Sequence, residues 1–177
     1  MGDTNGYLIV GLFAMFVTLI TTPVVRWFAR EHDWVALPDE RKVHTVPTPN
    51  VGGIALFAGV VAAIGLAWNM DRFTPLFQGN SELTGVLLGA LVVLVVGARD
   101  DVKEVSAPAR VIAIVGAGMM LVWFGVTMFY FRVPFFGVIQ LGNDWIPIVT
   151  AVWLLGMVQA INLIDGLDGL AAGIVAI

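Results

Sequence analysis

The chain has 177 residues, of which 59% are hydrophobic and 12% are charged. Soluble domains average about 45–50% apolar and about 25% charged residues, so this composition excludes an ordinary soluble protein. The net charge of −4 and nine scattered basic residues argue against nucleic-acid binding, and the absence of cysteine excludes disulfides, thiolate zinc sites and a cysteine nucleophile.

Charge-free stretches divide the chain into candidate membrane helices, each of which needs about 20 apolar residues. Five stretches qualify, and a sixth apolar run begins at Leu170 and continues to Ile177, where the chain stops inside a helix. We therefore predict an all-α, polytopic integral membrane protein with five complete transmembrane helices and the start of a sixth, in a single transmembrane domain (1–177). The five predicted spans are approximately 7–25, 51–70, 83–98, 111–131 and 146–164.

The basic residues predict the orientation, because cytoplasmic loops are enriched in lysine and arginine. Seven of the nine follow the first predicted span or lie between the third and fourth spans, and only Arg72 and Arg132 lie in the other loops. We therefore expect the N-terminus outside and cytoplasmic loops at about 26–50, 99–110 and 165–169.

Two G-x-x-x-G patterns, Gly85 to Gly89 and Gly169 to Gly173, permit close helix packing. With 20 glycines such matches arise easily, and we interpret both as packing features.

The third predicted span ends directly in Arg99, Asp100 and Asp101. Carboxylates at a membrane boundary are costly unless they face protein, water or a cation. One interpretation is a helix stop in which the two acids pair with Arg99, Lys103 or Arg110. The other is a site for a cation or a phosphate, and this stretch taken alone does not decide between them.

A second polar group follows the fifth predicted span, where Asn162, Asp165 and Asp168 recur in steps of three. In a helix this spacing keeps the three side chains on one slowly drifting face. If Gly166 and Gly169 break the helix, backbone groups also become available to a ligand. The alternative is a polar turn before the sixth span, although such a turn has no need for apolar residues between the acids.

The predicted topology puts both acidic groups on the same face of the membrane. Four neighbouring carboxylates repel one another at neutral pH unless a cation neutralises them. Mg²⁺ is usually held by one or two carboxylates together with substrate phosphates. The pattern therefore indicates metal-assisted handling of a phosphate or diphosphate at the cytoplasmic interface.

A third feature is the predicted cytoplasmic stretch 39–53. Arg41 and Lys42 are candidates to bind phosphates, and the nearby prolines Pro47 and Pro49 favour an extended loop. Taken alone, this stretch is better explained by topology, which requires basic residues beside a span. A lone histidine such as His44 is likewise usually a surface or hydrogen-bonded residue.

Together these residues resemble the polyprenyl-phosphate N-acetylhexosamine-1-phosphate transferases, membrane enzymes of glycosyltransferase family 4. Three motifs match in order and on the predicted side of the membrane, and they cover most of the chain from residue 39 onward. They are Arg41-Lys42-Val43-His44 followed by Pro47, Pro49 and Gly52-Gly53; Gly97-Ala98-Arg99-Asp100-Asp101 with Arg110 downstream; and the run from Asn162 to Ala171.

The resemblance implies transfer of an N-acetylhexosamine 1-phosphate from a UDP-sugar to a polyprenyl phosphate such as undecaprenyl phosphate, with release of UMP. It implies a Mg²⁺ requirement, with Mn²⁺ as a substitute, and an active site on the cytoplasmic face of the plasma membrane. The reaction would be the first membrane step of cell-envelope glycan synthesis, such as lipopolysaccharide or teichoic acid. Direct attack by the lipid phosphate and a covalent carboxylate intermediate both stay open.

By motif, the resemblance assigns residue roles. Asp100 and Asp101 would be catalytic, beside the metal and the lipid phosphate, with one of them as the base. The nucleotide and metal side would be formed by Asn162, Asp165 and Asp168, and further substrate contacts would come from Lys42, His44 and Arg110. The implied metal ligands are Asp101, Asp165 and Asp168.

The first motif looks like the branch that uses UDP-N-acetylglucosamine or a related simple sugar. The muramoyl-pentapeptide branch usually carries a Thr-Pro-Thr-Met-Gly-Gly-like run, whereas this chain has Thr48-Pro49-Asn50-Val51-Gly52-Gly53. Family members are commonly about twice this long, with about ten or eleven spans and a later histidine-containing loop. We therefore expect an N-terminal portion of such an enzyme, a chain completed by another polypeptide, or an inactive protein.

Other functions fit less well. CDP-alcohol phosphotransferases also use membrane aspartates, but Asp165-Gly166 is not followed here by the Ala-Arg pair of that class. A truncated, non-catalytic membrane subunit or a cation- or proton-coupled transporter fragment would also place acids near the membrane. The expected partners are thus a UDP-N-acetylhexosamine, a polyprenyl phosphate lipid and the membrane, without nucleic acid, and the sequence also allows a homodimer.

Overall fold

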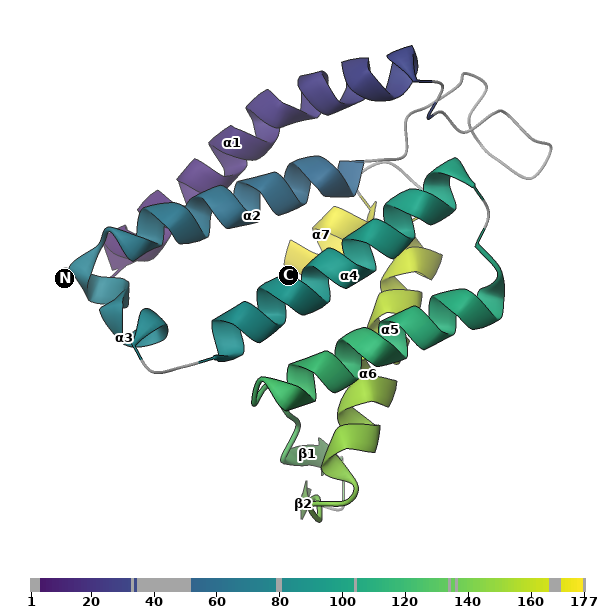
Figure 1. Ribbon diagram of the computed structural model, residues 1–177. Coiled ribbons are helices and arrows are strands. Elements are labelled where there is room, and N and C mark those ends of the chain that lie inside the picture. The colour runs from purple at the N-terminus through teal and green to yellow at the C-terminus, as the bar shows by residue number, and fades with distance from the viewer. Residues whose placement is uncertain are drawn as a thin grey trace. The chain divides into compact units, whose positions relative to one another are not determined.

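The computed structural model describes residues 4–32, 34, 52–78, 81–103, 105–133, 135, 137–165 and 170–176. Helices dominate these residues, and the chain order of the elements can be followed in Figure 1. The elements are α1 (Thr4–Glu31), α2 (Gly52–Trp68), the 3₁₀ turn η1 (Asp71–Phe73), α3 (Thr74–Phe77), α4 (Glu82–Val102), α5 (Ala107–Trp123), β1 (Tyr130–Val133), β2 (Gly137–Gln140), α6 (Ile146–Ile164) and α7 (Leu170–Ala176).

The chain divides into two compact units, each of which is described by itself. Unit 1 comprises Met1–Leu83 and Val93–Ser106, and unit 2 comprises Thr84–Val92 and Ala107–Ile177. Helix α4 is therefore divided between the units, with Thr84–Val92 in unit 2 and its remaining residues in unit 1. The single transmembrane domain expected from the sequence stays a prediction.

In unit 1, α1 and α2 lie side by side (Figure 1). The buried residues of α2 recur at every fourth position and are all small. A Cβ atom added at Gly59 would lie 2.8 Å from the backbone oxygen of Ala14 and would overlap the hydroxyl of Thr18. Small residues thus let the two backbones approach closely, as is common between membrane helices. The buried stripe consists of Ala55, Gly59, Ala63 and Ala67.

The start of α1 contacts the turn that follows α2. The guanidinium carbon of Arg72 lies 4.9 Å from the centre of the Tyr7 ring, and this ring packs edge-on against Phe73 at 5.2 Å. A bend of 100° separates α2 from the short helical segment 71–77. Cation–π and aromatic contacts therefore hold this bend against α1.

In unit 2, α5 and α6 cross at a pair of small residues. A Cβ atom added at Gly118 would lie only 2.7 Å from the Cα atom of Ala151. Beside this contact, the buried hydroxyl of Thr150 donates to the Ile146 carbonyl at 2.7 Å and accepts from the Met128 N–H at 3.0 Å. The two helices are therefore closely packed at this crossing. The hydroxyl of Thr150 also holds the segment after α5 through its hydrogen bond with Met128.

The first G-x-x-x-G pattern is confirmed as a packing feature. Gly85 and Gly89 are buried on α4, and an added Cβ atom would overlap Phe124 at the first position and lie 3.2 Å from Leu121 at the second. In the second pattern, a Cβ atom added at Gly173 would meet no other part of the described residues within 4 Å, and Gly169 lies outside them.

A β-hairpin departs from the all-α prediction. Strands β1 and β2 pair antiparallel, with Tyr130 opposite Gln140 and Val133 opposite Gly137. The predicted span 111–131 is therefore wrong at its C-terminal end, because α5 ends at Trp123. Gly125 has a φ of 90°, a left-handed conformation that ends helices and that glycine adopts readily.

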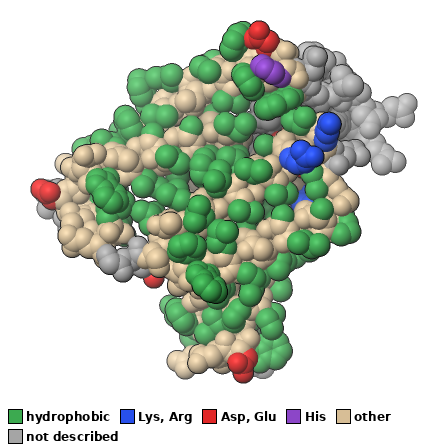
Figure 2. All heavy atoms as spheres, in the orientation of Figure 1, with side chains coloured by type: hydrophobic (Ala, Val, Ile, Leu, Met, Phe, Trp, Pro, Cys, Tyr) green, Lys and Arg blue, Asp and Glu red, His purple; other side chains and the backbone are tan. Residues whose placement is uncertain are grey.

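The helices agree in part with the predicted spans. Three are long and apolar enough to cross a membrane, namely Asn5–Glu31, Glu82–Val102 and Ile146–Ile164. Helix α2 qualifies only together with its bent partner, and α5 is shorter. Figure 2 shows hydrophobic side chains over most of one face, as a lipid environment requires.

Two predicted loops differ from expectation. The first residues of the predicted loop at about 26–50 are helical, because α1 continues to Glu31, and residues 33 and 35–50 lie outside the described residues. The loop at about 99–110 shrinks to residues 103–106, because α4 extends to Val102 and α5 begins at Ala107. The predicted loop 165–169 begins after α6 as expected, but residues 166–169 lie outside the described residues.

Candidate functional site

The acidic pair lies in the last turn of α4. Asp100 is half-buried, and its Oδ1 atom accepts a hydrogen bond of 2.9 Å from the backbone N–H of Val105. The helix closes with the Lys103 N–H donating to the Arg99 carbonyl at 2.8 Å. Asp101 is exposed. The turn after the helix therefore holds the Asp100 carboxylate, whereas the Asp101 side chain is the more exposed of the two.

The second polar group lies at the end of α6. Asp165 follows the last helical residue, and its N–H donates to the Ile161 carbonyl at 3.0 Å. Asn162 lies three residues earlier, and both side chains are exposed. The helix therefore brings these two polar groups to one end, as their spacing predicts. Asp168 lies outside the described residues.

The predicted basic residues are described only in part. Arg110 lies in the first turn of α5 and is half-buried, with its Nε atom buried. Lys42 and His44 lie outside the described residues. Asp100 and Asp101 belong to unit 1, whereas Arg110, Asn162 and Asp165 belong to unit 2. The convergence of the two acidic groups therefore stays a prediction.

The chemistry of the donors suits a hard divalent cation. Among the described residues, no group of three or more aspartate, glutamate, histidine or cysteine side chains is placed to hold a metal ion. The exposed carboxylates of Asp101 and Asp165 are nevertheless oxygen donors of the kind that Mg²⁺ takes. Because Mg²⁺ usually keeps water and binds substrate phosphates beside one or two carboxylates, the chemistry of each of these acids fits it, and a site that they share stays a prediction.

A hollow beside the acidic pair was not predicted from the sequence. It has a volume of about 260 Å³ and is lined by Trp34 together with Ala98, Arg99, Val102 and Lys103 of the last turn of α4 and the residue that follows it. In the sequence, Arg99 and Lys103 indicate topology and are candidate partners of the two acids, but nothing there indicates a hollow beside them. The Trp34 indole comes from a distant part of the chain, so the spacing of residues around Arg99 could not predict its position in the hollow.

Gln159 was also missed. It lies on α6 three residues before Asn162, so it continues the polar steps toward the middle of the helix. Its Oε1 atom is buried and has no hydrogen-bond partner among the described residues. The spacing alone could have identified this residue as a fourth member of the series, ahead of Asn162, Asp165 and Asp168.

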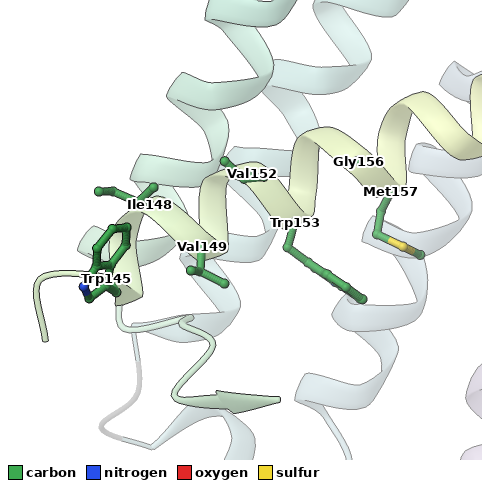
Figure 3. Close-up of a pocket in the computed structure, with 7 residues that line it drawn as sticks. All are labelled: Trp145, Ile148, Val149, Val152, Trp153, Gly156 and Met157. Atoms are coloured by element: carbon green, nitrogen blue, oxygen red, sulfur yellow. The ribbon is translucent and has the colours of Figure 1, made fainter. Parts of the chain in front are cut away.

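The other half of α6 carries an apolar hollow of about 370 Å³. Figure 3 shows Val149, Trp153 and Met157 extending from the same side of the helix, as residues four apart do. The hollow contains none of the predicted catalytic residues. Its seven lining residues are Trp145, Ile148, Val149, Val152, Trp153, Gly156 and Met157.

Known proteins match this chain over most of its length. A probable undecaprenyl-phosphate N-acetylglucosaminyl 1-phosphate transferase of Bacillus subtilis is 38% identical over 92% of this chain and 43% of its own length. A decaprenyl-phosphate N-acetylglucosaminephosphotransferase of Mycobacterium leprae is 36% identical over 94% of this chain and 42% of its own length. An undecaprenyl-phosphate alpha-N-acetylglucosaminyl 1-phosphate transferase of Thermotoga maritima is 29% identical over 92% and 47%.

The chain thus spans less than half the length of these relatives. No solved structure matches it significantly. The sequence model of glycosyl transferase family 4 matches residues 83–177, more than half of the chain, including both acidic motifs. The chain therefore belongs to glycosyl transferase family 4.

Proposed function

We propose that the chain forms part of a phosphoglycosyltransferase that moves an N-acetylhexosamine 1-phosphate from a UDP-sugar to a polyprenyl phosphate, at the cytoplasmic face of the plasma membrane. The observation that carries the proposal is the exposed Asp101 at the end of apolar α4, in a chain of this family. The relatives' names support a polyprenyl phosphate acceptor. They also favour a transferase over a transporter fragment.

The site suits one substrate from the membrane and one from the cytosol. An isoprenoid phosphate keeps its chain in the bilayer while its charged head reaches the interface, and a nucleotide sugar arrives from the cytosol. The ends of α4 and α6 each carry polar side chains directly after an apolar helix. At such a boundary the two substrates can react while the lipid chain stays in the membrane and the nucleotide sugar stays in the cytosol.

In the proposed reaction, an oxygen of the lipid phosphate ends bonded to the sugar-linked phosphorus of the UDP-sugar. The bond between that phosphorus and the bridging oxygen breaks, and UMP leaves with the bridging oxygen and its electrons. Where the lipid phosphate carries a proton, Asp100 or Asp101 accepts it. A covalent aspartyl intermediate would give the same products, so the number of steps stays open.

Each residue has a proposed task. Asp101, Asp165 and Asp168 would hold Mg²⁺, which when bound neutralises the diphosphate and the charge that develops on the departing UMP. Asn162 would orient the nucleotide side of the donor. Arg110, Lys42 and His44 would contact substrate phosphates through charge-assisted hydrogen bonds.

The sugar is proposed to be N-acetylglucosamine. The run Thr48-Pro49-Asn50-Val51-Gly52-Gly53 differs from the pattern usual in the muramoyl-pentapeptide branch. The names of the three relatives reported above all specify N-acetylglucosamine. UDP-N-acetylglucosamine should therefore be a better donor than a UDP-muramoyl pentapeptide.

The test measures UMP release and sugar incorporation into lipid by the complete protein in reconstituted membranes. Asp101→Asn and Asp165→Asn should each abolish both signals at saturating Mg²⁺. Asp71→Asn and Asp144→Asn are matched controls, because both acids are exposed and lie in loops predicted to face outside. Near-normal turnover in Asp101→Asn and Asp165→Asn would refute the assignment.

A further inference from the structure

The hollow beside α4 is an amphipathic site. Its helical part comes from Ala98, Arg99 and Val102, which lie on one face of the last turn, and Lys103 follows directly. Trp34 closes it from the segment after α1. Arg99, Val102 and Lys103 are exposed, so the hollow is open to its surroundings.

The indole is held in place by aromatic neighbours. The Trp34 ring packs edge-on against Phe28 at 5.5 Å between ring centres, and the backbone N–H of Trp34 donates to the Ala29 carbonyl at 2.7 Å. His32 stacks on Phe28 at 4.1 Å. Because Trp34 is anchored in this way, it forms a fixed wall and does not simply lie on the surface.

The lining residues favour a ligand in which an anionic group lies next to an apolar part. Arginine offers a planar fork that matches a phosphate, and lysine adds a second positive charge. Tryptophan prefers the membrane interface, where its ring meets lipid and its N–H meets the headgroups. Ala98 and Val102 leave an apolar floor between these groups.

The hollow is distinct from the acidic pair. At 3.6 residues per turn, Arg99 and Lys103 are nearly aligned, whereas Asp101 lies about half a turn from Arg99. Asp100 is engaged on its own side by the Val105 N–H. The last turn of α4 therefore presents its basic and acidic side chains in different directions.

Simpler roles explain only part of this arrangement. Basic residues near a helix C-terminus interact favourably with the helix dipole, and positive charge beside a span sets topology. Neither effect requires an anchored indole beside both charges.

We propose that the hollow of Trp34, Ala98, Arg99, Val102 and Lys103 binds the phosphate headgroup of an anionic phospholipid. On the predicted topology this lipid belongs to the cytoplasmic leaflet, where negatively charged lipids attract basic residues near the surface. The site goes beyond the proposed transferase reaction. It would anchor the end of α1 to the end of α4 through one lipid.

Retention of lipid by the complete protein tests the proposal without any sugar donor. Protein released from nanodiscs with equal amounts of phosphatidylcholine and phosphatidylglycerol should retain phosphatidylglycerol preferentially in native mass spectrometry. In the double variant Arg99→Gln, Lys103→Gln this retention should fall by roughly tenfold. The matched control Arg26→Gln, Arg30→Gln removes the same charge from the exposed end of α1 and should retain the lipid. Equal loss in both double variants, or no loss in the first, would refute the site.

Competition identifies the source of the phosphate. Excess phosphatidylglycerol should outcompete millimolar inorganic phosphate, and undecaprenyl phosphate should not displace the bound phospholipid. Displacement by inorganic phosphate would mean a site for soluble anions, and displacement by undecaprenyl phosphate would mean an acceptor site. Either result would overturn the proposal.

Fluorescence provides a test with the native basic residues in place. Phosphatidylglycerol brominated near the glycerol end of its acyl chains should quench Trp34, so wild-type protein should lose more emission than the Trp34→Phe variant. Brominated phosphatidylcholine should produce a smaller difference. Equal quenching by both lipids would contradict a headgroup-specific site.

Discussion

The carboxylate of Asp100 accepts a hydrogen bond from the N–H of Val105 at 2.9 Å, across the end of α4. The neighbouring Asp101 is exposed. Asp100 and Asp101 are adjacent in the motif, but their surroundings thus differ. Asp100 stabilises the turn, and Asp101 is the more exposed of the two.

Asp100→Ala should therefore lower thermal stability, by about 1 kcal/mol for the lost hydrogen bond. Asp100→Asn keeps an Oδ1 acceptor and should lose less. Thermal unfolding of the purified protein in detergent measures both variants. A loss in Asp100→Asn as large as that in Asp100→Ala would contradict the role of this hydrogen bond.

Gly118→Ala should weaken the packing of α5 against α6. The new methyl group would lie 2.7 Å from the Ala151 Cα atom, and overpacking of this kind costs about 1–3 kcal/mol. Gly116→Ala is the matched control, because an added Cβ atom there meets nothing within 4 Å in the described residues. The control should be neutral or slightly stabilising through its higher helix propensity. Equal melting temperatures in the two variants would show that the crossing is looser than described.

Thr150→Val should destabilise the segment after α5. Valine keeps the shape of threonine but removes the oxygen that accepts from the Met128 N–H, which leaves that donor without its partner at a cost of about 1–3 kcal/mol. Thr150→Ser retains the hydroxyl and should preserve most of the stability. Slower amide exchange at Met128 in wild type than in Thr150→Val would support the role, and equal exchange would count against it.

Gln159→Met should raise stability by about 1 kcal/mol, because it replaces a buried acceptor without a described partner by an apolar group of similar length. Thermal unfolding in detergent provides the measurement. Gln159→Glu, which places a charge at the same position, should have the opposite effect. A loss of stability in Gln159→Met would mean that Oε1 has a partner in the complete protein.

The sequence predicts the helices well, because uninterrupted apolar runs have few other stable structures in a membrane. It predicts their ends less well. Helix α1 continues through Arg26 and Arg30, since a helix can carry long basic side chains beyond the apolar core. Helix α5 stops at Trp123 although the apolar run continues, since Gly125 adopts a positive φ.

The β-hairpin shows a similar limit. Its first strand lies at the end of an apolar run in which aromatic and β-branched residues suit a strand as well as a helix. For the site, Asn162 and Asp165 lie at the end of α6, where the fifth predicted span was expected to end, and their shared role stays a prediction. The hollow at Arg99 could not be predicted, because Trp34 reaches it through tertiary structure alone.

The central claim is that Asp101 and Asp165 act together on one membrane face, and single-cysteine labelling tests it most directly. These 177 residues contain no cysteine, so in a protein freed of any cysteine elsewhere, one introduced at position 101, 144 or 165 gives an unambiguous signal. A membrane-impermeant maleimide should label positions 101 and 165 only in inverted membrane vesicles, and position 144 only in intact cells. Labelling of position 101 and position 165 from opposite sides would contradict a shared site.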